Sequence, residues 1–96
     1  MVFTKEEEQE LYKRVNEKWG TASQLVMVIE ECSELITEVS KNLRFPYGLS
    51  LGLLKEGVDV QIMINQLKTI LPQDEWDEMY SYKLRRLQSR LEGKQI

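Results

Sequence analysis

Apolar residues recur at intervals of three and four along almost the whole chain, which is the spacing that places side chains on one face of an α-helix. The first run of this kind comprises Leu11, Tyr12, Val15 and Trp19. Thr4 and Glu7 have the spacing of an N-terminal capping box, and Gly commonly follows a helix end, as Gly20 does here. The pattern therefore predicts a first helix from Thr4 to Trp19.

A second helix is predicted to start at Thr21, with Gln24 at the capping-box position. Its apolar stripe comprises Leu25, Val28, Ile29, Cys32, Leu35, Ile36 and Val39. Each residue turns a helix by about 100°, so Glu31, Glu34 and Glu38 share one flank of this stripe, whereas Glu30 lies further round. From this helix alone, a solvated acidic flank and a functional one are both open interpretations.

A third helix is predicted from about Leu51 to Leu71, after a connection in which Phe45, Pro46, Tyr47 and Gly48 indicate a turn. From Val58 to Leu67 this helix is apolar on nearly every side, which is typical of a buried helix. Asp59 is unusual in that setting, because a buried ionised carboxylate without a partner is costly.

Pro72 is predicted to end the third helix and to open a fourth, which continues to Gly93. Its apolar positions are Trp76, Tyr80, Leu84, Leu87 and Leu91. The chain of 96 residues is long enough for one domain, so we expect a single all-α domain of four helices over residues 1–96.

Composition excludes several kinds of function. A net charge of -3 is unfavourable for gripping a nucleic-acid backbone, and no apolar run reaches membrane-spanning length. The segment from Met1 to Glu10 is acidic and unlike a signal peptide, which predicts a cytoplasmic protein. The chain has no His, and its single Cys, Cys32, cannot form an intrachain disulfide or a Cys-rich zinc site. Carboxylates are the remaining candidates for catalysis.

Two carboxylate pairs stand out, because the members of each pair are three residues apart within a predicted helix. Glu31 and Glu34 form one pair, and Glu56 and Asp59 form the other. Two helices packed side by side could aim all four at one point, where like charges would repel strongly unless a cation were bound. Oxygen-only ligands favour a hard cation, with Mg2+ first and then Mn2+ or Ca2+.

The order Glu30-Glu31-x-x-Glu34 followed by Glu56-x-x-Asp59 resembles the MazG-like all-α nucleotide pyrophosphohydrolases, which are relatives of the dimeric dUTPases. The resemblance runs from Trp19 to Lys41 and resumes at Glu56, so it covers most of the chain. It implies Mg2+-dependent hydrolysis of a nucleoside triphosphate to the monophosphate and pyrophosphate. Glu31, Glu34, Glu56 and Asp59 would bind the metal, Glu30 would orient a water or a second cation, and Glu30 or Glu38 could act as the base.

The resemblance also suggests residues that would contact the substrate. Lys41 fits the family pattern and is a candidate for contact with a substrate phosphate, although complementing the dipole at the helix C-terminus is an equally open role. Lys83 and Arg90 fit a family segment in which the Lys helps to hold substrate phosphates. Trp19 and Tyr47 are candidates for stacking on a base, although core packing is the simpler role for Trp19. The sequence departs from the family at Leu87, where an Asn is common, and at Lys55, where relatives often carry an acid.

The apolar surface of the third helix exceeds what three short partner helices can cover, which predicts association with a partner chain. Family members pair their helices into bundles, so a homodimer or homotetramer is expected. Two alternatives to an enzyme stay open at this point. One is a metal-binding or nucleotide-binding module without turnover, and the other is a plain helical oligomerisation module with solvated acids.

Overall fold

The computed structural model describes residues 2–44 and 50–94, and all the regular structure within them is helical. It consists of α1 (Lys5–Arg44), α2 (Leu51–Thr69) and α3 (Gln73–Leu91). The prediction of an all-α chain is confirmed. The turn predicted at residues 45–48, including the stacking candidate Tyr47, lies outside the described residues.

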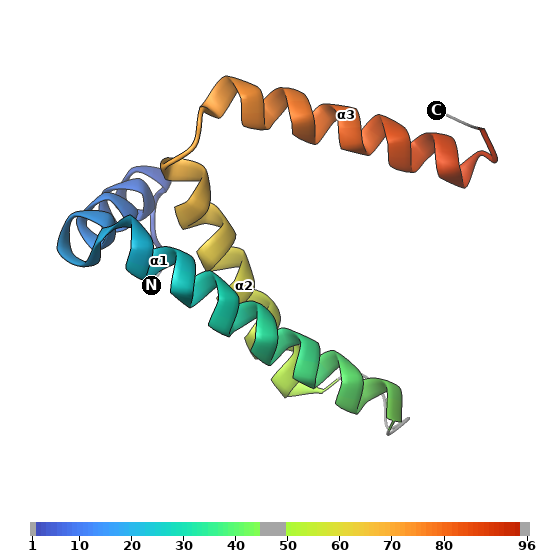
Figure 1. Cartoon of the computed structure of the whole chain (residues 1–96), viewed down its shortest axis with the longest axis horizontal. Helices are drawn as coiled ribbons and strands as arrows, with labels where there is room; N and C mark the ends of the chain where they lie inside the picture. The colour runs from blue at the N-terminus through green and yellow to red at the C-terminus, as the bar shows by residue number, and fades with distance from the viewer. Residues whose placement is uncertain (1, 45–49, 95–96) are drawn as a thin grey trace.

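Helix α1 is interrupted at Gly20, where the sequence predicted separate first and second helices. Gly20 has φ 81° and ψ 163°, a conformation that residues with a Cβ rarely adopt. The chain resumes helical geometry at once, so three helices are present in the described chain and α1 has a sharp bend. Figure 1 shows the N-terminal segment of α1 turned away from the longer segment that follows it.

The capping box predicted at Thr4 and the helix start predicted after Pro72 are both present. The backbone N–H of Thr4 donates to Glu7 Oε1 at 2.9 Å, and the backbone N–H of Glu7 donates to Thr4 Oγ1 at 3.1 Å. This capping box lowers the pKa of Glu7, chiefly because its carboxylate accepts the Thr4 backbone hydrogen bond. Ser50 caps α2 by accepting a hydrogen bond from the Leu53 backbone N–H at 3.0 Å, and Pro72 precedes α3.

The longer segment of α1 and α2 lie side by side and run in opposite directions, forming a helical hairpin (Figure 1). Asn42 and Ser50 are hydrogen-bonded to each other at the end of the hairpin where α1 stops and α2 starts. The Asn42 Nδ2 donates to Ser50 Oγ at 3.1 Å, and the Ser50 backbone N–H donates to Asn42 Oδ1 at 3.1 Å. These bonds set where α2 begins relative to α1.

The N-terminal segment of α1 packs against the far end of α2 through a small polar network. Tyr12 is only 3% exposed, and its hydroxyl donates to Glu8 Oε1 at 2.6 Å. Asn65 Nδ2 lies 3.4 Å from both the Glu8 carboxylate and the Tyr12 hydroxyl, and Asn16 Nδ2 donates to Thr69 Oγ1 at 2.9 Å. The bend at Gly20 thus allows both segments of α1 to contact α2.

Few apolar side chains are buried by these contacts. Tyr12 and Met63 are the buried apolar residues of the described chain. The expectation that α2 is buried on nearly every side is wrong within one chain, because Val58 is 47% and Ile62 is 42% exposed. The core role expected for Trp19 is also wrong, since its side chain is 56% exposed. Both errors arise because a hairpin covers only one side of each helix.

Helix α3 extends away from the hairpin and contacts only α2 among the described helices (Figure 1). It has no buried residue. The chain exposes 8047 Å², whereas about 5,800 Å² is expected for a compact monomer of 11.4 kDa. Its radius of gyration is 16.5 Å, compared with about 12.5 Å for a compact domain of this length. A single chain is therefore more open than a typical monomeric domain.

Among the described helices, no segment combines the length and the apolar character that a bilayer crossing requires.

Candidate metal centre

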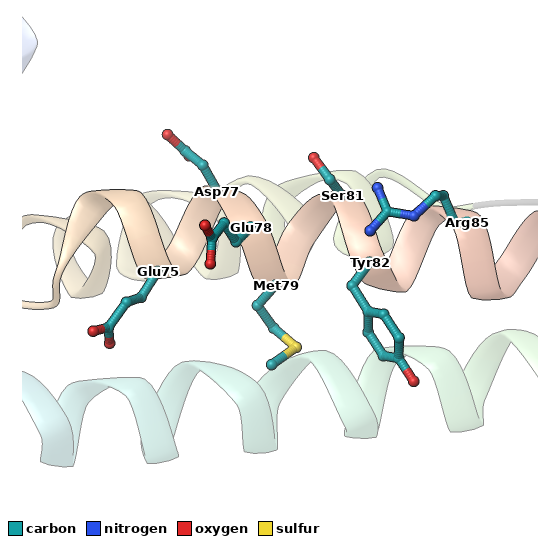
Figure 2. A pocket seen from close by; sticks show the side chains of 7 residues that line it. All are labelled: Glu75, Asp77, Glu78, Met79, Ser81, Tyr82 and Arg85. Carbon is teal, nitrogen blue, oxygen red and sulfur yellow. The ribbon is translucent and has the colours of Figure 1, made fainter.

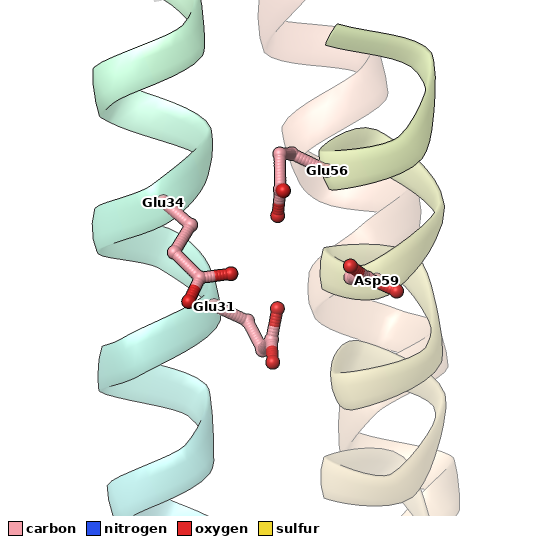
Figure 3. A group of neighbouring side chains, drawn as sticks. All are labelled: Glu31, Glu34, Glu56 and Asp59. Carbon is pink, nitrogen blue, oxygen red and sulfur yellow. The ribbon is translucent and has the colours of Figure 1, made fainter. Parts of the chain in front are cut away.

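Four carboxylates meet between α1 and α2. Glu31 and Glu34 extend from neighbouring turns of α1, and Glu56 and Asp59 belong to neighbouring turns of α2 (Figure 3). One oxygen from each residue can be chosen so that all four oxygens lie within 4.8 Å of one another. The antiparallel hairpin brings the pairs together, because it sets residue 31 opposite residue 59 and residue 34 opposite residue 56.

The cluster is partly shielded from water. Glu31, Glu56 and Asp59 are half-buried, whereas Glu34 is exposed. Glu31 Oε2 and Glu56 Oε2 are individually buried, and neither has a hydrogen-bond partner among the described residues. Buried carboxylate oxygens without partners are unfavourable in a folded protein. A positive group between the two helices would relieve this cost.

Desolvation and mutual repulsion change the acidity of the cluster. The pKa of Glu31 is raised from its ordinary value of 4.5, first by loss of hydration and then by the negative charges of Glu34, Asp59 and Glu56. The pKa of Glu56 is raised by loss of hydration and by contact with Glu34, although the nearby Lys55 opposes this rise. Lys55, a departure from the family pattern, thus supplies a positive charge next to the cluster.

The donors of this cluster fit a divalent cation. All four are carboxylates, the ligand type preferred by Mg2+, Mn2+ and Ca2+. None of the four takes part in an ion pair within the described part of the chain, where the two pairs found are Lys41 with Glu38 and Lys94 with Glu92. A cation at this point would satisfy the unpartnered oxygens of Glu31 and Glu56 and would remove the repulsion.

The other acidic candidates lie outside the cluster. Glu30 is exposed on α1 and is not one of the four converging residues. Glu38 lies one turn beyond Glu34, and its carboxylate pairs with Lys41 Nζ at 3.4 Å. The Glu38 carboxylate also lies close to Gly52 of α2, where a Cβ would come within 2.6 Å of Glu38 Oε2. Glu38 is therefore near the hairpin interface, and its ion pair is with Lys41 and not with the cluster.

The basic candidates are divided between two parts of the molecule. Lys41 is in the last turn of α1, on the hairpin that carries the carboxylates. Lys83 and Arg90 are exposed on α3, which does not contact α1 in the described chain. Lys83 Nζ lies 5.9 Å from the centre of the Tyr82 ring. The structure thus places the carboxylates on the hairpin and two of the three predicted phosphate contacts on α3.

A pocket of about 590 Å³ opens between α1 and α2 near the Gly20 bend. Most of its wall is apolar, and it is lined by Val15, Trp19, Ser23, Gln24, Val26, Met27, Met63 and Gln66. Gln24 is 7% exposed, and its side chain lines this pocket. Among the described residues it makes no hydrogen bond to Thr21, so the capping box predicted there is not formed. We call this space the Trp19 pocket.

Gln66 was not singled out from the sequence. It is 8% exposed, and its Oε1 is buried without a hydrogen-bond partner among the described residues. One signal was available, because Gln66 is one of the few amides in the mostly apolar part of its helix and shares a face with Asp59. It lies seven residues after Asp59, just as Gln24 lies seven residues before Glu31.

A second hollow lies along α3, and its wall comes from α3 alone. It is lined by Glu75, Asp77, Glu78, Met79, Ser81, Tyr82 and Arg85 (Figure 2). Because no side chain of α1 or α2 closes this hollow, it is an uncovered surface of α3 and not an enclosed site.

Comparisons with family models, with curated proteins and with solved structures found no match to this chain. Its function is therefore inferred from the carboxylate cluster, the Trp19 pocket and the sequence pattern that contains them.

Proposed function

We propose that the protein is a Mg2+-dependent nucleoside triphosphate pyrophosphohydrolase of the MazG-like all-α kind. The observation that carries this proposal is the convergence of Glu31, Glu34, Glu56 and Asp59 within 4.8 Å, with two of their oxygens buried and unpartnered. Structural acids are normally paired or solvated. The substrate class and the bond cleaved come from the resemblance in sequence.

In this proposal Glu31, Glu34, Glu56 and Asp59 hold Mg2+, for which Mn2+ is a possible substitute. A divalent cation bound there would offset phosphate charge and favour deprotonation of water. Glu30, next to Glu31 and exposed, accepts a proton from the water that attacks the α-phosphorus. The bond between the α-phosphorus and the oxygen of the departing pyrophosphate then breaks, which leaves the nucleoside monophosphate.

Lys41 supports the phosphate end of the substrate from the hairpin itself. Its ammonium group is exposed, and its ion pair with Glu38 spans only one helical turn. Such exposed pairs are weak, so the ammonium can exchange Glu38 for a substrate phosphate at little cost. Lys83 and Arg90 offer further positive charge from α3.

We also propose that the four helical segments form a bundle with a partner chain, as a homodimer or homotetramer. The chain exposes about 2,000 Å² more than a compact monomer of its mass, an excess of the size that obligate interfaces bury. Helix α3 contributes an exposed apolar stripe of Tyr80, Leu84, Leu87 and Leu91. Sedimentation at micromolar concentration should give a multiple of 11.4 kDa, and an 11.4 kDa species alone would refute the association.

The experiment that tests the enzymatic proposal is a pyrophosphate-release assay against a panel of ribo- and deoxyribonucleoside triphosphates. Release should require Mg2+ and should stop when the metal is chelated. If metal and nucleotide bind without turnover, the protein is a binding module. If no divalent metal binds in a titration, the carboxylates are solvated acids and the helical oligomerisation module becomes the better interpretation.

A further inference from the structure

The Trp19 pocket contains a buried amide that lacks a partner. Gln66 Oε1 has almost no exposed surface, and no donor within the described residues reaches it. A carboxamide left in this condition is unusual, because the large majority of buried polar atoms in proteins are hydrogen-bonded. Gln24, also more than nine-tenths buried, lines the same pocket from the opposite helix. Two amides thus lie in a wall that is otherwise mainly apolar.

The pocket and the carboxylate cluster lie on the same face of the hairpin. Gln24 is seven residues before Glu31 on α1, and Gln66 is seven residues after Asp59 on α2. Seven residues are about two helical turns, so each amide lies about 10 Å along its helix from a carboxylate on the same face. Because the helices are antiparallel, both displacements point toward the Gly20 bend (Figure 1). A sugar and the first phosphates of a nucleotide can bridge this separation.

We infer that the Trp19 pocket receives the base of a nucleotide and that Gln66 is the residue that pairs with the hydrogen-bonding edge of that base. This inference rests on the proposed function for the position of the phosphates. Trp19 supplies an aromatic surface for the base, and Met63 and Val15 supply apolar contacts. The terminal torsion of Gln66 rotates readily, so its orphaned oxygen can turn toward an N–H donor of the base.

A helix from a partner chain is the competing occupant of this pocket. Trp19 and Val26 are 56% and 52% exposed, so they belong to the apolar surface that self-association would cover. However, an apolar side chain from a partner would leave the Gln66 oxygen without a donor, so its cost would remain. A base edge carries a donor next to an acceptor and satisfies the carboxamide. The orphaned amide thus favours a base over an apolar helix.

The test measures nucleoside binding directly, without metal and without phosphate. Trp19 fluorescence reports occupancy of the pocket, and a Trp76→Phe background removes the other tryptophan signal. Titration with uridine, thymidine, cytidine, adenosine and guanosine should quench this fluorescence saturably for at least one base. In Gln66→Met, which keeps an unbranched side chain of similar length, binding of that nucleoside should weaken about tenfold, the loss expected for one hydrogen bond.

The matched control is Gln61→Met, which makes the same change at an exposed position of α2 outside the pocket. It should bind nucleosides like the parent. Thermal melting of both variants would show whether either change has disturbed the fold. A Gln66→Met variant that melts like the parent and binds nucleosides equally well would overturn the inference, as would the absence of saturable quenching in the parent.

These outcomes separate the pocket from the catalytic proposal. If nucleosides bind through Gln66 but no triphosphate is hydrolysed, the inference holds and the enzymatic proposal fails. If triphosphates are hydrolysed but Gln66→Met changes neither nucleoside binding nor the preference among bases, the enzymatic proposal holds and the inference fails. In an active enzyme, Gln66→Met should raise KM for nucleotides with little change in kcat, because the amide contacts the base and not the reacting phosphate.

Discussion

The helical hairpin of α1 and α2 and helix α3 differ in the unfavourable feature that each retains in the single chain. The hairpin is built from internal contacts, including the clamp between Asn42 and Ser50 and the network around Tyr12, but it holds four carboxylates that repel one another. Among the described residues, α3 contributes no acid to this converging group. It has an apolar stripe with no buried residue and almost no contact with the rest of the chain.

Under the two proposals, the two regions would bind different kinds of partner. A cluster of like charges is relieved by a small cation, which adds charge and little surface. An uncovered apolar stripe is relieved by another protein surface, which removes area from water at about 25 cal/mol per Å². Each missing component can be tested separately, because a substitution in one region should leave the property of the other region largely unchanged.

The largest effect should come from α3. Leu87 is 61% exposed in the chain, and in the proposed assembly it is buried against a partner. Leu87→Asp should weaken association about a thousandfold, since burial worth about 2 kcal/mol is lost from each of two copies. Analytical ultracentrifugation would measure this change. Gln88→Asp, at the exposed neighbouring position, is the matched control and should associate like the parent. Equal behaviour of the two variants would mean that the stripe is not an interface.

The next effect concerns the carboxylates of α1. Glu31→Gln and Glu34→Gln each remove one anionic ligand, so each should lower pyrophosphate release by about a hundredfold or more and weaken Mg2+ binding. Glu38→Gln should do much less, because Glu38 pairs with Lys41 and lies outside the cluster. All three variants should associate like the parent. Equal losses of activity in the three variants would show that the proposed set of metal-binding residues is wrong.

A smaller effect distinguishes a metal-binding role of Asp59 from a structural role. In chelator, Asp59→Asn should melt at the same temperature as the parent or higher, because one repelling charge is removed. Near a hundredfold excess over its dissociation constant, Mg2+ should stabilise the parent by about 2.7 kcal/mol and the variant far less. Differential scanning calorimetry with and without Mg2+ measures both quantities. A variant that loses about 3–5 kcal/mol in chelator and still hydrolyses nucleotide would instead be missing a structural ion pair.

The smallest effect is a dependence on pH that belongs to the hairpin alone. The raised pKa values of Glu31 and Glu56 mean that the folded, metal-free protein retains protons that the unfolded chain has released above pH 4.5. Their contribution to stability should therefore fall as the pH rises from 4.5 through the raised values, and it should recover on acidification. Melting curves in chelator, compared with those of a Glu31→Gln and Glu56→Gln double variant, isolate this contribution. The double variant should melt above the parent by an amount that shrinks on acidification. A gap between the two melting temperatures that widens on acidification would contradict this prediction.

Much of the local structure followed from the sequence by itself. The capping box at Thr4, the break at Gly20 and the helix start after Pro72 depend on neighbouring residues, and such effects are contained in a short stretch of chain. The spacing of three residues within each carboxylate pair also fixed which acids share a helix face. The sequence pattern alone was thus sufficient to predict an all-α chain and to nominate Glu31, Glu34, Glu56 and Asp59, although it divided the bent helix α1 into two helices.

Only the tertiary structure decided which side chains are covered. Apolar periodicity shows that a residue has an apolar environment in the final protein, but it does not say whether that environment comes from the same chain. Val58, Ile62 and Trp19 were therefore predicted to be buried and are exposed in this chain. The antiparallel pairing of α1 with α2 also decided that Gln24 and Gln66 share one pocket, because residues 42 positions apart meet only through packing.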